Sequence, residues 1–456
     1  MSTILLAGFG WLAGSLADLY LTPYRSSPLD GRRYGLIGLN GSGKSTFLRC
    51  VGRRDVPIPS HVDIFLLERE VEPTDLTPIQ CVLELREKEV TRLEREADLL
   101  LETEDGPESE RLQQIYERLY EELDLEKAIL DGAPLVHPTH PNNIAADFTQ
   151  ICGNPEETFA QAEHVTRIKI QVDRSTAAAM ECRTVAARYD AVTGELVVWD
   201  GTQAPLGVRG GLASIFGLNE DRVRVIAPDI GGGFGQKVVF PYPDELLVPF
   251  AAMQIGRPVK FIEDRRENFI GSSQERTQIH EIELYANKNG EVIALKDDFL
   301  HDTGAFIPYG IAVAQVASTS IAGPYRIPNI HVRFRAVYTP TVQVTPYRGC
   351  GRPQACFAIE RAMDQLADDL GLDRLEVRRR NLIRDDEFPY IREGLLFADG
   401  LRVEHDSGQY LKTLEMAREA IGWDGFAAEQ AAARRAGKRL GLGLAFYVEG
   451  TGLGPY

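Results

Sequence analysis

Pro228-Asp-Ile-Gly-Gly-Gly-Phe-Gly-Gln-Lys237 is the stretch that decides the fold of most of this chain. Four of the five residues in 231–235 are glycine. Because glycine loses more backbone entropy on folding than any other residue, such a run is a poor helix or strand interior. It suits a loop in which bare N–H groups approach the oxygens of a ligand. A glycine-rich turn between strands is the alternative, and the neighbouring sequence must decide.

Patterns on both sides of this loop predict a mixed α/β domain. We expect strands at 164–172, 196–199, 223–226, 259–262, 279–285, 292–301 and 441–448, and helices at 206–216, 244–255 and 355–370. Asn287 to Gly290 form a turn sequence that predicts a hairpin between two of the strands. The helix at 355–370 is amphipathic, with these residues expected to face inward: Phe357, Ile359, Met363, Leu366 and Leu370.

The composition excludes several classes of protein. With 456 residues, 44% of them hydrophobic, the chain is long enough for roughly two to four domains. A net charge of -17 argues against nucleic acid or an anionic membrane as a partner. No apolar run reaches the roughly 18–20 residues that span a bilayer. The six cysteines form no CxxC pair and the eight histidines no HExxH motif, which disfavours a zinc site and favours a reducing cytoplasm.

A second motif lies far upstream and fits the pattern GxxxxGK[ST] of a phosphate-binding P-loop. In such a loop the glycine backbone wraps the phosphates, Lys44 reaches the terminal phosphates and Ser45 holds Mg²⁺. The residues expected at a nucleotide are Gly38, Asn40, Gly41, Gly43, Lys44, Ser45 and Thr46.

The run RRYGLIGLNGSGKSTFL and the later HVDIFLLEREV resemble the ABC-F subfamily of ABC ATPases over about residues 30–127. This resemblance implies ATP and magnesium as ligands. An LSGGQ-type motif and an apolar strand ending in Asp-Glu do not follow, so we expect nucleotide binding without hydrolysis. Apolar residues at helical spacing from about 81 to 127, broken at Gly106-Pro107, predict an antiparallel helical hairpin.

The motifs from residue 128 onward resemble the molybdenum-binding large subunit of the xanthine dehydrogenase, aldehyde oxidase and aerobic carbon monoxide dehydrogenase family. They are DGAPLVHP, AMECRTVAARYD, VWDGTQAPLGVRGGLA, the glycine loop, TPYRGCGRPQACFAIERAMDQLADDLGLD and EVRRRNLI. The resemblance implies an oxidoreductase with molybdopterin, usually as its cytosine dinucleotide in bacterial relatives. It also implies iron–sulfur and FAD partner subunits and a small-molecule substrate.

The resemblance implies a site with three chemical parts. Gln203 matches a glutamine that hydrogen-bonds an oxo ligand, and its NH₂ group donates without adding charge. Phe234 would shield the metal from water, and Arg348 would hold an oxyanion or a polar substrate edge. Glu181 matches a position near the pocket wall, with a structural role as the alternative. Residues expected to contact the cofactor are Gln203, Gly232, Gly233, Phe234, Gly235, Tyr347, Arg348 and Gly349.

Departures from the family narrow the substrate. Val238 and Val316 stand where purine hydroxylases carry a glutamate and an arginine. Gly349 stands where carbon monoxide dehydrogenases carry the copper-binding cysteine. An aldehyde or an aromatic N-heterocycle remains. The family's general base, a glutamate late in a second cofactor domain, has no counterpart here, so we expect the chain to be inactive alone unless a second chain supplies that half.

The sequence therefore predicts a composite: a P-loop strand–helix unit with a helical hairpin, then a mixed α/β molybdopterin-binding domain. An ATP-binding P-loop protein and a chimeric protein without catalysis are the alternatives. The expected divisions are 1–127 for the ABC-F-like fragment, 128–138 for a remnant of a small N-terminal domain, 139–385 for the first molybdopterin-binding domain, 386–440 for a helical connector and 441–456 for the truncated start of a second cofactor domain.

Overall fold

A computed structural model describes residues 3–7, 63–67, 92, 95–96 and 124–450. The chain divides into two units, Met1–Glu89 and Val90–Tyr456, and each is treated by itself. In the first unit, β1 (Thr3–Ala7) and β2 (Asp63–Leu67) pair in parallel. The P-loop residues 38–46 and nearly all of the expected helical hairpin lie outside the described residues.

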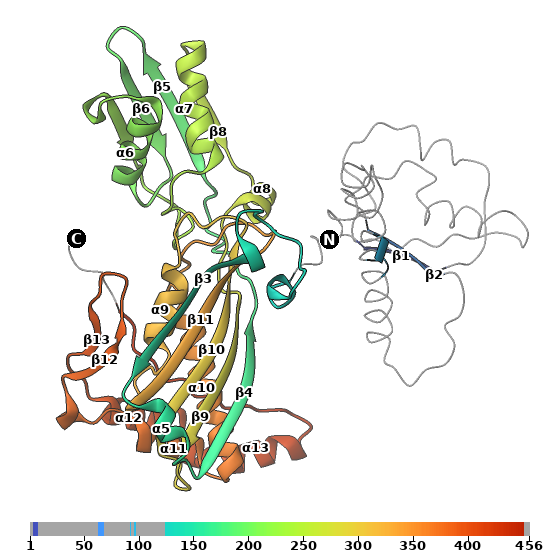
Figure 1. Ribbon diagram of the computed structural model, residues 1–456, viewed down its shortest axis with the longest axis vertical. Helices are drawn as coiled ribbons and strands as arrows, with labels where there is room; N and C mark the ends of the chain where they lie inside the picture. The colour runs from blue at the N-terminus through green and yellow to red at the C-terminus, as the bar shows by residue number, and fades with distance from the viewer. Residues whose placement is uncertain (1–2, 8–62, 68–91, 93–94, 97–123, 451–456) are drawn as a thin grey trace, which may run out of the picture. The chain divides into compact units, whose positions relative to one another are not determined.

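The second unit contains a five-stranded sheet (Figure 1). Its order is β3 (Ile144–Cys152), β11 (Asn329–Tyr338), β10 (Val292–Gly304), β9 (Gln278–Ala286) and β4 (His164–Val172). β10 and β11 are parallel, and the other neighbours are antiparallel. The hairpin predicted between β9 and β10 is confirmed. The Asn287 side chain accepts hydrogen bonds from two amides of its turn, and Gly290 has a φ of 78°.

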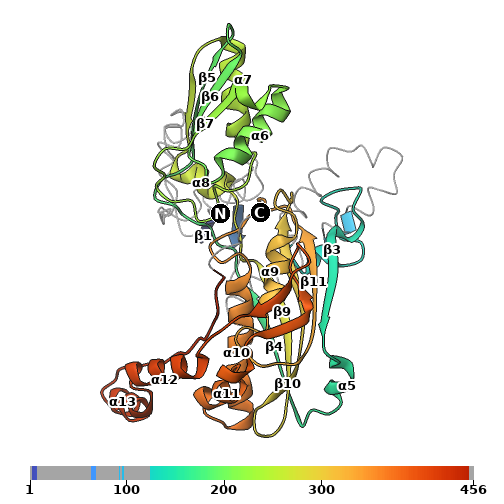
Figure 2. The same cartoon turned by 90° about the vertical axis from the view of Figure 1, so that its left-hand side faces the viewer.

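Two helices, α9 (Ala312–Ser320) and α10 (Arg352–Leu370), lie along this sheet (Figure 2). α10 packs on β4, β9 and α9, and its residues Ile359, Met363 and Leu366 are buried in the main core, as predicted. The prediction for Phe357 is wrong, because its side chain is 46% exposed. At 3.6 residues per turn, Phe357 lies about 200° around the helix from Ile359, so it faces away from the core.

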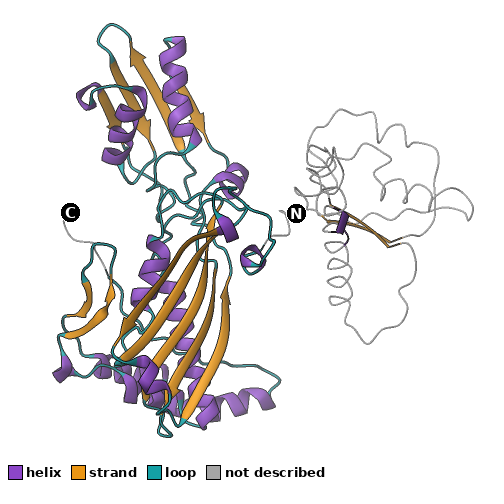
Figure 3. Ribbon diagram, viewed as in Figure 1, coloured by secondary structure: helices purple, strands orange, loops and turns teal. Residues whose placement is uncertain are grey.

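A separate four-stranded sheet has its own hydrophobic core (Figure 3). Its order is β7 (Val223–Ile226), β6 (Glu195–Asp200), β5 (Thr184–Asp190) and β8 (Val259–Ile262). β6 runs parallel to β7, and α6 (Pro205–Phe216) follows β6 in the chain. α7 (Pro243–Ile255) packs on β5 and β8. The strands and helices predicted for this part are confirmed.

The remaining elements are short or lie near the C-terminal side of the described chain. They are α5 (Pro155–Phe159), α8 (Arg265–Gly271), α11 (Arg374–Asn381), β12 (Tyr390–Leu396), β13 (Arg402–His405), α12 (Tyr410–Ile421) and α13 (Trp423–Arg435). The connector thus contains an antiparallel strand pair, β12 and β13, besides helices. In the described part of the chain, every helix is too short or too polar to cross a bilayer.

The strand predicted at 441–448 is wrong, because these residues have no regular structure. The backbone N–H of Phe446 donates to the Glu360 carboxylate at 3.0 Å, so it does not enter a strand ladder. The Phe446 ring is buried against Tyr410, with ring centroids 6.0 Å apart. An apolar pattern alone does not make a strand when a helix side chain takes its backbone donor.

Candidate functional site

The glycine loop after β7 approaches two other segments more closely than any side chain would allow. A Cβ built on Gly235, which has a φ of 100°, would lie 1.9 Å from the Pro346 carbonyl oxygen. A Cβ on Gly233 would lie 2.4 Å from Oε1 of Gln203. Phe234 itself has a φ of 55°, which is uncommon for a residue other than glycine. Close contact with the Pro346 backbone at Gly235, and with the Gln203 side chain at Gly233, explains why the loop contains glycine at these positions.

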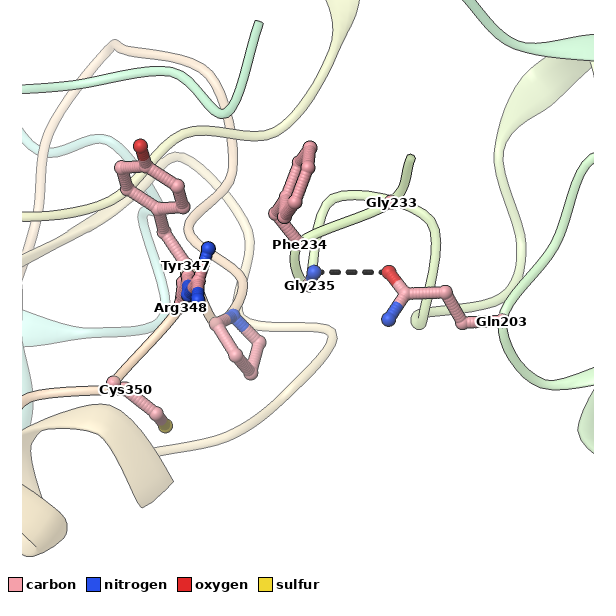
Figure 4. Close-up of a pocket in the computed structure, with 9 residues that line it drawn as sticks. Gln203, Gly233, Phe234, Gly235, Tyr347, Arg348 and Cys350 are labelled. Atoms are coloured by element: carbon pink, nitrogen blue, oxygen red, sulfur yellow. Dashed lines mark hydrogen bonds between the residues drawn. The ribbon is translucent and has the colours of Figure 1, made fainter. Parts of the chain in front are cut away.

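Gln203 lies in the turn between β6 and α6, at the carboxyl end of a strand with a parallel neighbour, where α/β sheets commonly bind ligands. Its main-chain N–H donates to the carbonyl of Lys237 at 2.8 Å. Its Oε1 accepts from the Gly235 N–H at 2.9 Å (Figure 4). Because an N–H must face an oxygen, this bond fixes the orientation of the amide. The NH₂ group of Gln203 makes no hydrogen bond to a described residue and is left as a donor to the cavity.

The loop that contains Arg348 forms the opposite wall. The Arg348 N–H donates to the Phe234 carbonyl at 2.9 Å, which ties this loop to the glycine loop. The guanidinium is exposed and forms no ion pair with any residue from 124 to 450. A cavity of about 550 Å³ opens between the two loops, lined by Gln203, Gly233, Phe234, Gly235, Pro346, Tyr347, Arg348, Gly349 and Cys350.

Glu181 binds the first residue of the glycine run, Gly231, from outside the cavity. Its carboxylate accepts from the Gly231 N–H at 2.7 Å and lies 3.5 Å from Nζ of Lys237. The Lys237 side chain is 1% exposed, and burial lowers the pKa of its ammonium group. Glu181 does not line the cavity. Of the two roles considered for Glu181, the structural one fits this geometry.

A buried polar network supports the other end of the loop. The Arg183 guanidinium stacks 3.6 Å from the centre of the Tyr242 ring and donates to Asp244 at 2.7 Å and to Glu263. The Tyr242 hydroxyl donates to the Gln236 carbonyl at 2.7 Å. Charge-assisted bonds of this kind are short and directional, so the network fixes where the glycine loop ends.

Two buried carboxyl groups near this network make stability depend on pH. Burial raises the pKa of Asp200 to about 7 and that of Glu245 to about 8. For both groups the pKa in the folded state lies above the value near 4 expected in the unfolded chain. The stabilisation that comes from preferential protonation of the folded state is therefore complete below about pH 4 and is lost as the pH rises through about 7–8.

Asp200→Asn, which mimics the protonated acid, is therefore expected to increase stability relative to the wild type as pH rises. The expected gain in the free energy of unfolding is about 2–3 kcal/mol larger at about pH 9 than at about pH 5. Urea denaturation at both pH values measures this gain. A gain in the free energy of unfolding that is the same at both pH values would contradict the raised pKa of Asp200. Asp221→Asn, on the surface, is the control.

The structure brings most of the predicted site residues to one cavity: Gln203, Gly233, Phe234, Gly235, Tyr347, Arg348 and Gly349. Gly232 is in the loop but not in the lining, and a Cβ there would lie 2.7 Å from the Phe234 ring. Sequence reasoning did not include Pro346 or Cys350 in the site, although both line the cavity. Burial raises the pKa of the Cys350 thiol to about 12, so this side chain is neutral. The nucleotide-binding residues predicted upstream lie outside the described residues.

Comparison with known proteins identifies the domain. Residues 136–382, more than half of the chain, match the family model described as "Molybdopterin cofactor-binding domain". The chain belongs to this family. The chain is 34% identical over 335 residues to the nicotine 6-hydroxylase large subunit of Paenarthrobacter nicotinovorans, covering 72% of this chain and 40% of that protein. Among solved structures, quinoline 2-oxidoreductase from Pseudomonas putida 86 matches with a TM-score of 0.62 and 32% identity, over 68% of this chain and 39% of that one.

The chain therefore spans about 40% of the length of these relatives. A stretch of 107 residues, 24% of this chain, is 52% identical to ATP-binding cassette sub-family F member 2 of Bos taurus, of which it covers 16%. Both family resemblances and the mixed α/β fold expected from the sequence are confirmed.

The residues of the molybdopterin-binding domain fit a group rich in oxygen atoms. The Gln203 NH₂ is a neutral donor held in place by Gly235, and Arg348 adds a positive charge that forms no ion pair within the described part of the chain. The wall between them is glycine backbone, at a place that a Cβ would fill. Such an arrangement of donors favours anionic or oxo-type ligands over apolar ones.

Proposed function

We propose that this chain is the cofactor-binding part of a molybdenum hydroxylase large subunit, acting in the cytoplasm with iron–sulfur and FAD subunits. The cofactor would be molybdopterin as its cytosine dinucleotide, and the reaction would be oxidative hydroxylation of an aldehyde or an N-heterocycle with water. The observation that carries the proposal is the Gln203 amide, whose orientation Gly235 fixes so that its NH₂ group faces the cavity shared with Arg348.

When bound, the molybdenum cofactor supplies the two-electron oxidation. The residues of this chain bind and orient the reactants. Gln203 donates a hydrogen bond to an oxygen of the cofactor without changing the local charge. With the cofactor bound, the Phe234 ring would cover one side of it, and the Arg348 guanidinium would orient a polar edge of the substrate; both side chains line the cavity.

The cavity lining contains no carboxylate and no imidazole among its nine residues. A general base must lie within hydrogen-bond reach of the proton that it removes. We therefore propose that the base for turnover comes from outside this cavity, from another part of the assembled enzyme. Cofactor binding, and not turnover, is the property that this domain is expected to show by itself.

Gln203→Glu tests the role of the amide. The carboxylate still accepts from the Gly235 N–H, but it cannot donate and adds a negative charge. We expect molybdenum retention to fall roughly 10–100-fold, because a hydrogen bond to a charged group contributes about 1.5–3 kcal/mol. Metal analysis of protein purified from a host that makes the cofactor measures this.

Gln171→Glu, at an exposed position on β4, is the matched control and should retain wild-type molybdenum. Wild-type molybdenum content in Gln203→Glu would show that the amide is not a cofactor ligand. Release of cytidine monophosphate on mild acid hydrolysis of the wild-type protein would support the dinucleotide form.

We propose a second function for the upstream segment, supported by its P-loop motif and by the 52% identity of a 107-residue stretch of this chain to an ABC-F protein. We expect it to bind ATP with Mg²⁺ through Lys44 and Ser45, with the backbone of Gly41 and Gly43 around the phosphates. Lys44→Ala should weaken ATP binding at least roughly tenfold in equilibrium dialysis. Lys288→Ala, on the surface hairpin, is the control. Equal ATP affinity in the wild type and in Lys44→Ala would contradict the proposal that Lys44 binds ATP.

A further inference from the structure

Glu275 is a fully buried carboxylate that holds both ends of the loop from Tyr347 to Gly351. One carboxylate oxygen accepts from the Tyr347 N–H at 2.8 Å. The other accepts from the Gly351 N–H at 3.0 Å and from the Gln354 side-chain amide at 3.1 Å. A buried carboxylate costs desolvation, and these three donors, with the Arg276 guanidinium, offset that cost. The two hydrogen bonds from backbone N–H groups therefore fix the positions of the two ends of the loop relative to each other.

Arg276, the next residue, holds the middle of the same loop. Its guanidinium donates to the carbonyl oxygen of Arg348 and, at 3.1 Å, to Oε1 of Gln354. It also stacks 4.5 Å from the centre of the Tyr347 ring and lies 3.3 Å from the Glu275 carboxylate. The φ of Arg276 is 90°, a conformation that favours glycine, so the surrounding contacts hold a strained backbone in place.

The backbone of Arg348 is consequently fixed on both sides. Its N–H is bound to the Phe234 carbonyl, and its carbonyl is bound to Arg276. Glu275 and Arg276 neutralise each other, so together they add no net charge to the cavity. The Arg348 guanidinium remains as the charged side chain of the lining.

We propose that Glu275 and Arg276 are positioning residues that set the direction in which Arg348 presents its guanidinium to an anionic or polar ligand. Neither residue is part of the cavity lining, and both act through the loop that carries Tyr347 and Arg348. This inference rests on the proposed cofactor function, because only a ligand in the cavity makes the direction of Arg348 matter.

Arg276→Gly removes the guanidinium without adding backbone strain, and rescue by a soluble guanidinium compound tests its positioning role. Glycine accepts a φ of 90° without strain, so the backbone can keep its path while the guanidinium is lost. In the full-length chain, we expect faster amide hydrogen exchange in residues 347–351 and a roughly tenfold loss of retained molybdenum, the size expected for losing a charged hydrogen bond. The thermal midpoint should also fall, because the buried Glu275 carboxylate loses its ion-pair partner and keeps only its three other hydrogen-bond donors. Millimolar methylguanidinium should restore both amide protection and molybdenum retention.

Glu275→Gln is a second variant with the same expected direction, since its NH₂ group would face backbone donors in place of an acceptor. Arg335→Ala removes an arginine that pairs with Asp298 on the large sheet, and it should leave exchange in 347–351 unchanged. Unchanged exchange and unchanged molybdenum in Arg276→Gly would overturn the inference. Faster exchange with full molybdenum retention would also overturn it, because the residues would then be structural only.

Failure of the proposed function gives a different result. A wild-type chain that is folded but carries no molybdenum refutes cofactor binding, whatever the exchange data show. Since the positioning role depends on a ligand, that result overturns the inference as well. Loss of molybdenum confined to the two variants supports both proposals.

Discussion

Gly235→Ala is expected to abolish molybdenum retention and to lower the free energy of unfolding by about 2–4 kcal/mol. The added Cβ would lie 1.9 Å from the Pro346 carbonyl oxygen, which is backbone and cannot rotate away. The φ of 100° adds strain, because an L-residue rarely adopts it. Relief of the clash requires the glycine loop to move away from the Arg348 loop, and that movement opens the cavity.

Gly194→Ala is the matched control. Gly194 also has a positive φ, 71°, but a Cβ built there meets nothing within 4 Å. The control therefore carries the backbone strain without the clash, and it should retain its molybdenum. Metal analysis and urea denaturation of both variants give the comparison. Equal molybdenum in the two variants would show that contact between the loops is not needed to hold the cofactor.

The second large effect is on stability and concerns Arg378. This arginine is fully buried and lies 2.8 Å from the carboxylate of Glu360, which is also buried. Arg378→Ala is expected to lower the free energy of unfolding by about 3–5 kcal/mol, because it leaves an uncompensated charge in the core. Burial raises the pKa of Glu360, so part of this cost is avoided at low pH, where the carboxyl group protonates.

Arg374→Ala on the same helix is the control. Arg374 pairs with Asp368 at the surface, where the two side chains are 40% and 53% exposed. Surface pairs contribute only about 0–1 kcal/mol. Chemical denaturation of both variants should therefore show a clear difference. If the two variants lose the same stability, the buried pair does not have the role assigned to it.

Local patterns predicted much of the fold. The two helices α6 and α7 and the strands β4, β7 and β8 begin and end within a residue of the sequence-based prediction. Periodicity identifies such elements because it reflects which face is buried. It failed at Phe357, where the apolar side chain lies on the wrong face of the helix, and at 441–448, where Glu360 takes a backbone donor.

The site was predicted in part. Motif resemblance placed Gln203, the glycine loop and Arg348 together, and the cavity contains all three. Glu275 and Arg276 were not predicted, because they act on backbone groups more than 70 residues away in the sequence. Hydrogen bonds from a side chain to a distant main chain leave no periodic signal and no motif. Only the three-dimensional arrangement shows which loop the pair supports.

The central claim is that the loop around Phe234 holds a molybdopterin. Its most direct test is the molar ratio of molybdenum to protein in the full chain purified from a host that makes the cofactor, with oxidised pterin fluorescence measured on the same sample. We predict molybdenum and pterin in equal amounts in the wild type and neither in Gly235→Ala. A folded wild-type chain that contains neither molybdenum nor pterin would contradict the account.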